Sequence, residues 1–347
     1  MSESVEQREP DQLNGVPLPE QRDWVIGHEA ARASLAERLT AERMPSAVLL
    51  HGPQGIGKAT LAFAMARDVL SGTGDEDPHR VAEQVAAGSH PNLYVLRKQP
   101  KDGKGFYTVI RVDDIRELRE RMRKTRGRQG YRVAIIDAID DCNTSAANAL
   151  LKTLEEPPAE TLFLLISHRP GQLLPTIKSR CHTVALRPIA DDSVRDVLAR
   201  TLPDADPAGF DIPVALAHGR PRRGFEALAM SDDGVLSALK GWLGSPASHP
   251  SIAHLSIADA LAADPASAEA SFGRDVIIDW MAEEARNAAL AGPEAHARLA
   301  SANELWDKAH ALFTDADSLN LDARQTLVII FDAIRKHVRR TSQTEPQ

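Results

Sequence analysis

A chain of 347 residues that is 43% hydrophobic and 26% charged has a globular composition and is long enough for two or three domains. No apolar run approaches the roughly 20 residues needed to cross a bilayer, and the polar, acidic first residues are unlike a signal peptide, so we expect a cytoplasmic protein without membrane contact. A net charge of -8 argues against strong DNA binding by this chain alone, because nonspecific affinity comes from neutralising phosphates.

The first elements of the chain surround a glycine-rich turn. Residues 1–20 are expected to be a flexible N-terminus, and residues 46–70 then predict a short apolar strand, a turn and a helix. The turn reads GPQGIGKAT from Gly52 to Thr60, which is nearly the phosphate-binding loop GxxxxGK followed by Ser or Thr. In such a loop, backbone N–H groups surround an anion, the lysine reaches the terminal phosphates and the hydroxyl binds magnesium.

The anion-binding part of this motif is complete, and its residues are Gly52, Gly55, Gly57 and Lys58. Ala59, however, stands where the magnesium-binding hydroxyl belongs. Thr60 is one residue further along the helix, rotated by about 100°, and should not replace that hydroxyl without local rearrangement. The turn therefore predicts phosphate binding with a defective metal site, and the alternative is a purely structural glycine-rich turn.

A second acidic element is expected at the end of a neighbouring strand. Residues 131–140 form an apolar run that predicts a buried parallel strand. The run contains Asp137 followed by Ala138, so the aspartate that supports magnesium is present and the glutamate that usually polarises the attacking water is absent. The alternative for Asp137 is a solvated strand terminus. Together with Ala59, the pattern indicates the fold of an ATPase from which the catalysis has been removed.

Strand and helix signals alternate over residues 21–188, which predicts an α/β domain with a parallel sheet. The strand signals then fade. Residues 189–243 are expected to form a small helical domain and residues 252–340 an all-helical C-terminal domain, separated by a linker rich in serine and proline. Two cysteines, Cys142 and Cys181, are too few for a disulfide framework or a tetrahedral zinc site, so we expect reduced, metal-free thiols.

Two segments make a family resemblance specific. NALLKTLEEPP (148–158) and LPTIKSRC (174–181) resemble the clamp-loader branch of the AAA+ ATPases, and most closely its delta-prime family from bacterial DNA polymerase III. The resemblance extends from about residue 20 to about residue 335. It implies a P-loop AAA+ parallel-sheet domain, a helical lid and an all-α C-terminal collar domain.

The resemblance also implies partners. Such a chain is a subunit of a hetero-pentameric ring with motor ATPase subunits and a delta subunit, and it meets primer-template DNA and the sliding clamp through the complex. The arginine of the Ser-Arg-Cys motif, here Arg180, then points into the adjacent subunit's nucleotide site. An arginine finger of this kind neutralises charge on the transferring phosphoryl group. The alternative for Arg180 is an ordinary surface or domain contact.

Further positions correspond to the nucleotide sensors of AAA+ proteins. Arg222 falls at the second-sensor position, with Arg220 and Arg223 as alternatives, and Ser167 or His168 falls at the first. Without catalysis, these residues need not keep a sensing role. We expect ATP binding that is weak or not followed by hydrolysis.

Two other features of the sequence leave alternatives open. Many delta-prime relatives carry a four-cysteine zinc module after the P-loop helix, but this chain has no cysteine there, so His79 and His90 are expected at the surface and no zinc is expected. Residues 116–132 hold seven arginines and one lysine, which predicts either a solvated helix face and turn or a contact with DNA or a neighbouring subunit.

The sequence therefore favours an ATPase-silent clamp-loader subunit that lends Arg180 to a neighbour. One alternative is an active motor ATPase of the same loader, against which Ala59 and Ala138 argue. Another is a P-loop kinase or metabolic ATPase, which would have no use for the Ser-Arg-Cys motif.

Overall fold

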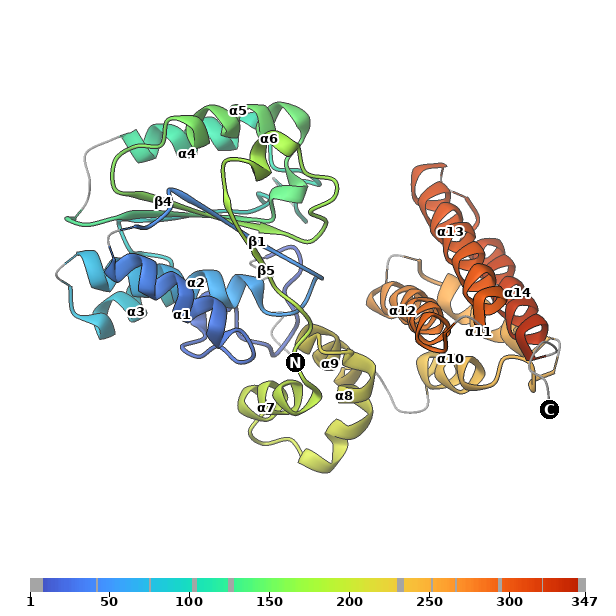
Figure 1. Ribbon diagram of the computed structural model, residues 1–347. Helices are drawn as coiled ribbons and strands as arrows, with labels where there is room; N and C mark the ends of the chain where they lie inside the picture. Colours follow the sequence, from blue (N-terminus) through green and yellow to red (C-terminus); the bar gives the residue numbers. More distant parts are fainter. Residues whose placement is uncertain are drawn as a thin grey trace. The chain divides into compact units, whose positions relative to one another are not determined.

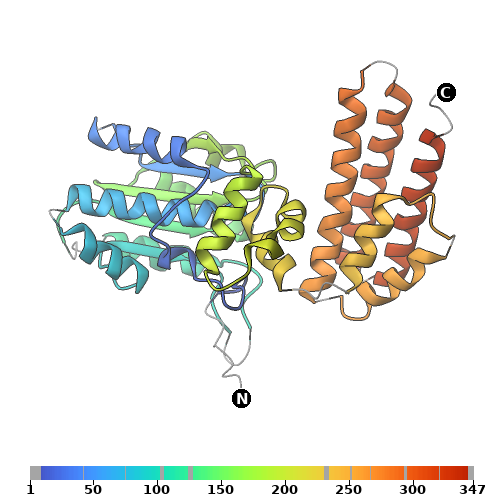
Figure 2. The ribbon, with the colours of Figure 1, turned by 90° about the horizontal axis from the view of Figure 1, so that it is seen from below.

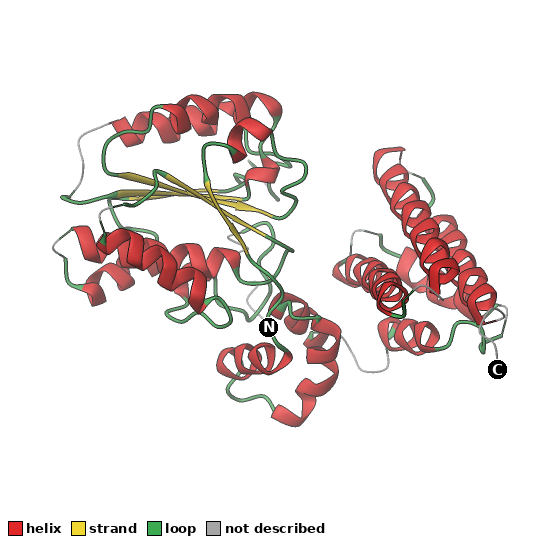
Figure 3. Cartoon of the chain, in the orientation of Figure 1, coloured by secondary structure: helices red, strands yellow, loops and turns green. Residues whose placement is uncertain are grey.

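The computed structural model describes residues 9–41, 43–74, 76–101, 105–123, 128–229, 234–250, 252–265, 267–292, 295–319 and 321–342. The chain divides into two compact units, Met1–Ala227 and Leu228–Gln347 (Figure 1). The first unit contains a sheet between layers of helices, and the described part of the second is helical (Figure 3).

A five-stranded parallel sheet forms the centre of the first unit. Its strands are β1 (Ala47–His51), β2 (Leu93–Leu96), β3 (Arg132–Asp137), β4 (Thr161–Ser167) and β5 (His182–Ala185). They are arranged in the order β2-β3-β4-β1-β5, with all pairs parallel. Every residue of β4 is buried, as expected for a central strand that helices cover on both faces. The predicted α/β fold with a parallel sheet is confirmed.

Helices cover both faces of this sheet. One face carries α1 (Glu29–Thr40), α2 (Lys58–Thr73) and α3 (Pro78–Ala86), and the other carries α4 (Val112–Arg123), α5 (Thr144–Glu155) and α6 (Pro175–Lys178) (Figures 1 and 2). Successive strand residues point to opposite faces, so Val48 and Leu50 join the core with α2, whereas Ala47 and Leu49 join the core with α5. The alternation gives the unit two apolar layers and leaves the carboxyl edge of the sheet open for polar groups.

Shorter elements complete the first unit. They are the 3-10 turns η1 (Pro19–Gln21), η2 (Ile139–Asp141) and η3 (Pro207–Phe210), and the helices α7 (Asp191–Thr201), α8 (Asp211–Ala217) and α9 (Pro221–Leu228). The last three helices follow β5 and correspond to the helical region expected from residue 189. Helix α9 contacts the glycine-rich turn, because the Arg222 N–H donates to the Gly55 carbonyl at 3.2 Å. The lid and the turn are thus joined by a backbone hydrogen bond.

The second unit is built from α10 (Val235–Gly244), α11 (Ala253–Ala262), α12 (Ala268–Leu290), α13 (His296–Leu319) and α14 (Ala323–Ser342). Its core includes Trp242 and Phe331, whose ring centroids are 5.0 Å apart. Helix α10, which the sequence analysis grouped with the lid, packs on α11 and α12 because it buries Trp242 together with three leucines. In the described part of the chain, no helix is long and apolar enough to span a membrane.

Candidate functional site

The turn between β1 and α2 has the backbone that a phosphate loop requires. Gly55 and Gly57 have φ angles of +84° and +93°, in the left-handed region that favours glycine. At Gly52 (φ +150°), a Cβ atom would collide with the carbonyl oxygen of Leu186. Glycine is therefore required by the conformation of the loop.

Lys58, the first residue of α2, is only 3% exposed. Its Nζ donates to the carbonyl oxygens of Gly52, at 2.7 Å, and of Pro53, at 2.6 Å. Burial lowers the pKa of Lys58 to about 8, against the opposing effect of the Asp137 and Asp140 charges. The ammonium group thus bridges its own loop at the point where a phosphate group would bind.

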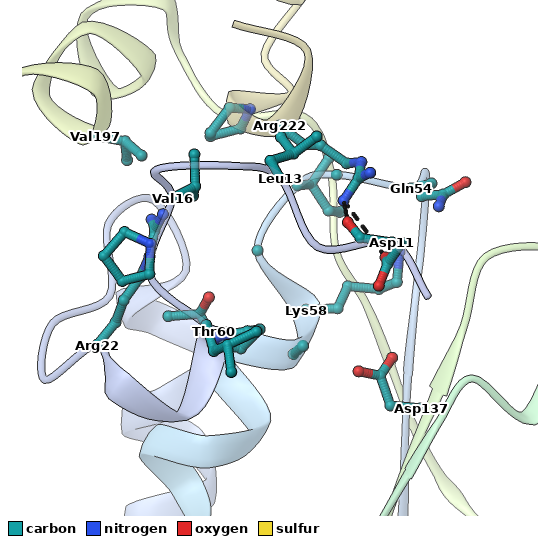
Figure 4. Close-up of a pocket in the computed structure, with 18 of the residues that line it drawn as sticks. Asp11, Leu13, Val16, Arg22, Gln54, Lys58, Thr60, Asp137, Val197 and Arg222 are labelled. Atoms are coloured by element: carbon teal, nitrogen blue, oxygen red, sulfur yellow. Dashed lines mark hydrogen bonds and ion pairs between the residues drawn. The ribbon is translucent and has the colours of Figure 1, made fainter. Parts of the chain in front are cut away.

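The turn, Asp137 and Arg222 line one cavity of about 180 Å³ (Figure 4). Of the predicted cofactor-binding residues, Gly55, Gly57, Lys58, Thr60, Asp137 and Arg222 line it. Gly52 is connected to these cavity-lining residues by its carbonyl oxygen, which accepts a hydrogen bond from Lys58 Nζ. Ala59 also lines the cavity and packs against the apolar core of the α2 face. The structure therefore brings together residues that the sequence places in three separate segments.

Asp137, at the end of β3, lies beside an arginine that the sequence analysis did not select. Arg97 Nε donates to Asp137 Oδ2 at 3.4 Å, and its guanidinium also pairs with Glu9 at 2.5 Å and Glu20 at 3.1 Å. Burial raises the pKa of Asp137, and the charge of Arg97 opposes the increase. Arg97 directly follows β2, and this position at the carboxyl end of a parallel strand is the signal by which the sequence could have identified it.

The end of β4 is held by Asp140. Ser167 Oγ donates to Asp140 Oδ1 at 2.9 Å, and the backbone N–H groups of His168 and Arg169 also donate to this carboxylate. His168 lines the cavity, and burial together with the Lys58 charge lowers its pKa to about 4. Its imidazole is therefore neutral at pH 7. Both first-sensor candidates, Ser167 and His168, are held in place by hydrogen bonds to the carboxylate of Asp140.

Arg222 is fixed by contacts on two sides. Its Nε donates to Glu226 at 2.8 Å, and its Nη1 donates to the backbone carbonyl of Asp11 at 2.5 Å. Neither Arg220 nor Arg223 is among the described residues that line the cavity, and Arg223 is buried. Of these three arginines, Arg222 is therefore positioned to meet a ligand in the cavity.

Residues of the N-terminus also line the cavity, from Glu9 to Pro19. Residues 1–20 are expected from the sequence to be a flexible N-terminus, and residues 1–8 of this segment lie outside the described part. Leu18 is 7% exposed, and Arg67 donates to the carbonyl oxygens of Glu20 and Arg22. Packing and hydrogen bonds thus hold this segment against the α/β unit.

Arg180 is not among the residues that line this cavity, and it follows Ser179, the C-cap of α6. Helix α6 lies on the face of the sheet opposite α2 (Figure 1). The Arg180 guanidinium donates to the Thr176 carbonyl at 2.9 Å and pairs with Glu155 at 2.7 Å. The Arg180 side chain is 34% exposed and that of Glu155 is 47% exposed. Glu155 belongs to the NALLKTLEEPP segment, so the two segments that carry the family resemblance meet at this ion pair.

The cysteines and histidines form no cluster of metal ligands in the described residues. Cys142 and Cys181 are free thiols, and burial raises their pKa values to about 12 and about 11. The expected surface position of His90 is wrong, because its ring is buried, with Nδ1 accepting from the Asn92 N–H and Nε2 lying 3.4 Å from Glu76.

The arginine-rich run divides into two environments, and its residues 124–127 lie outside the described part. Arg116 and Arg121 are exposed on α4 and pair with acidic residues of the same helix. Arg132 is buried and donates to the Met122 carbonyl. The exposed arginines fit the predicted solvated helix face, whereas Arg132 has a structural contact.

These observations define a class of protein. The first unit is a P-loop domain of the AAA+ type. It has a parallel sheet in the order β2-β3-β4-β1-β5, a phosphate loop after β1, the acidic residue Asp137 at the end of β3 and lid helices after β5.

Comparison with known proteins narrows the class. Residues 27–190 match the family described as DNA polymerase III, delta subunit. DNA polymerase III subunit delta' of Pseudomonas aeruginosa is 39% identical over 179 residues, which cover 50% of this chain and 53% of that protein. The chain is thus similar to the delta' subunits of DNA polymerase III, and it spans about half the length of the delta' relatives that it matches.

Other relatives are more distant. Subunit gamma/tau of Mycobacterium bovis is 32% identical over 206 residues, or 57% of this chain and 35% of that protein. The solved structure of a gamma subunit-related protein from Thermotoga maritima has 16% sequence identity and a TM-score of 0.44, and it covers 88% of this chain and 99% of that one.

Proposed function

We propose that this chain is a clamp-loader subunit of DNA polymerase III that does not hydrolyse ATP and that supplies Arg180 to the nucleotide site of a neighbouring subunit. The main support is the position of Arg180, which is exposed and lies outside the cavity of its own chain. The guanidinium group of Arg180 can contact a nucleotide phosphate in that position only if a second chain brings the phosphate to it.

The proposed silence rests on two missing side chains. Ala59 offers magnesium no hydroxyl, and Ala138 offers the attacking water no carboxylate. Ala138 is 3% exposed, so its methyl group is packed against other atoms of the chain. The glycine-rich turn with Lys58 is retained, which supports binding of ATP that is weak or not followed by hydrolysis.

The contacts of Arg180 hold its guanidinium group in place but are weak enough to be exchanged for a phosphate group. An ion pair between partly exposed side chains contributes only about 0–1 kcal/mol, so exchange of Glu155 for a phosphate group costs little. The Thr176 carbonyl holds one end of the guanidinium, which limits its freedom before a neighbour arrives. A planar fork of donors is well matched to the equatorial oxygens of a transferring phosphoryl group.

The proposed partners are the motor ATPase subunits and the delta subunit of a hetero-pentameric ring, with primer-template DNA and the sliding clamp reached through the complex in the cytoplasm. Similarity to both delta' and gamma/tau subunits supports these partners. The all-helical second unit, Leu228–Gln347, is proposed as the collar that assembles the ring.

A second candidate is an active motor ATPase of the same loader. The 32% identity to gamma/tau over 206 residues favours it. The isolated chain distinguishes the two, because a motor subunit turns over ATP in the presence of magnesium and a silent subunit does not.

The decisive experiment measures clamp- and DNA-stimulated ATP turnover of a loader reconstituted with Arg180→Ala. Turnover at the one site that Arg180 completes should fall by about a thousandfold while assembly is unchanged, because an arginine finger contributes roughly 10³–10⁵ in rate. The total turnover of the loader should fall by the share of that site. Arg195→Ala is the matched control, since Arg195 is 39% exposed and pairs with Asp211 at 2.5 Å. Equal turnover of the two variants, or turnover by the isolated wild-type chain, would refute the proposal.

A further inference from the structure

The N-terminal segment covers the candidate nucleotide cavity. Residues 9–18 are called here the N-terminal strap, and most of them line the cavity together with Lys58 and Arg222 (Figure 4). The family match begins at residue 27, so the strap lies N-terminal to the matched residues.

Polar contacts hold the strap at two arginines. Arg222 Nη1 donates to the Asp11 carbonyl at 2.5 Å and lies 3.5 Å from Asp11 Oδ2, and Figure 4 marks both contacts. Arg97 Nη1 donates to Glu9 Oε1 at 2.5 Å. The strap thus gives carboxyl and carbonyl oxygens to cations at the carboxyl edge of the sheet, where a P-loop protein binds phosphate oxygens.

Apolar contacts hold the rest of the strap. Leu13 and Val16 are half-buried and line the cavity, with Val16 on the side towards Val197 of α7 (Figure 4). The two residues lie at the ends of a turn, because the Val16 N–H donates to the Leu13 carbonyl at 3.3 Å and Gly15 between them has a φ of +73°. The strap therefore places an apolar group beside the lid helices and acidic groups beside the cations.

The space that remains is small. The cavity has a volume of about 180 Å³, below the roughly 300–1,000 Å³ of typical small-molecule sites. Lys58 is also satisfied within the loop, by the carbonyl oxygens of Gly52 and Pro53. A nucleotide would have to displace the strap to gain both volume and cationic partners.

We infer that the N-terminal strap is an intramolecular competitor of nucleotide, which closes the phosphate loop in the free chain and leaves when a nucleoside diphosphate or triphosphate binds. The inference rests on the proposed ability of the cavity to bind nucleotide. It is independent of the proposed role of Arg180.

The test is a double substitution in the full chain, Leu13→Ser with Val16→Ser, which removes apolar contacts and leaves the net charge unchanged. The dissociation constant for ADP, measured by calorimetry, should fall at least about tenfold, because the strap reduces the fraction of binding-competent chain. Ile212→Ser with Leu290→Ser is the matched control, since these side chains are 57% and 80% exposed and do not line the cavity.

A second measurement follows the strap itself. In the wild-type chain, saturating ADP should increase the amide exchange of residues 9–18 while β4 stays protected. Equal ADP affinity of the two double variants would overturn the inference, and so would unchanged protection of the strap in the ADP complex. If neither variant binds ADP, the strap is not what closes the cavity and the proposed nucleotide binding fails with it, whereas the Arg180→Ala experiment in the loader is unaffected.

Discussion

The phosphate-loop cavity and the Arg180 corner belong to the same α/β unit but differ in how their cations are held. Lys58 is 3% exposed and bonded within its own loop, whereas the Arg180 side chain is 34% exposed and has one carboxylate partner. A buried, internally satisfied cation suits static binding, and an exposed cation suits exchange with another molecule. This difference supports the proposal that the chain keeps a phosphate-binding geometry in its own loop and presents Arg180 to another molecule.

The largest expected effect concerns the phosphate-loop cavity and follows from substitution of Asp140. Asp140→Ala removes an acceptor from Ser167 Oγ and from the backbone N–H groups of His168 and Arg169. Because Ser167 is fully buried, its hydroxyl loses a partner that water cannot replace. The free energy of unfolding of the α/β unit should fall by about 3 kcal/mol, measured by urea denaturation.

Asp141→Ala is the matched control for this prediction. Asp141 is 26% exposed, and its carboxylate pairs with Lys98 at 3.1 Å. An ion pair of this kind contributes about 0–1 kcal/mol. Equal destabilisation by the two substitutions would mean that Asp140 does not anchor the end of β4.

The next effect tests whether Arg180 acts through its charge alone or through its planar guanidinium group. Arg180→Lys keeps the charge but loses the planar fork of donors, so stimulated turnover at the site that Arg180 completes should fall by about a hundredfold, equivalent to about 2.7 kcal/mol in barrier height. Glu155→Gln is the control, because it removes the partner of Arg180 and leaves the guanidinium intact. A lysine variant as active as Glu155→Gln would show that charge alone is needed.

The smallest effect tests the burial of Lys58. Its pKa is lowered from 10.5 to about 8, so between these pH values the unfolded chain binds more protons than the folded chain and stability rises with pH. From pH 7 to pH 9.5, the wild type should gain about 2 kcal/mol in unfolding free energy relative to Lys58→Met, whose side chain does not titrate. A constant difference between the two proteins across this range would mean that the ammonium is solvated.

Much of the fold followed from local patterns in the sequence. The strands β3 and β4 are continuous apolar runs, because both of their faces are covered by helices. The edge strand β5 gave no such signal, since its residues are alternately half-buried and exposed. Helix α10 was grouped with the lid for a related reason, because the side on which a helix packs is decided by apolar partners from distant segments, here α11 and α12.

The sequence by itself determined the chemistry of the two sites. A few adjacent residues define each of these local features: the glycines and Lys58 of the turn, the alanines at positions 59 and 138, and Arg180 after its helix. Only the tertiary structure decided what surrounds them. Arg97 meets Glu9 across 88 positions and Arg222 meets Asp11 across 211, because parallel strand order and lid packing bring distant segments to one edge of the sheet, where no short stretch of sequence records the contact.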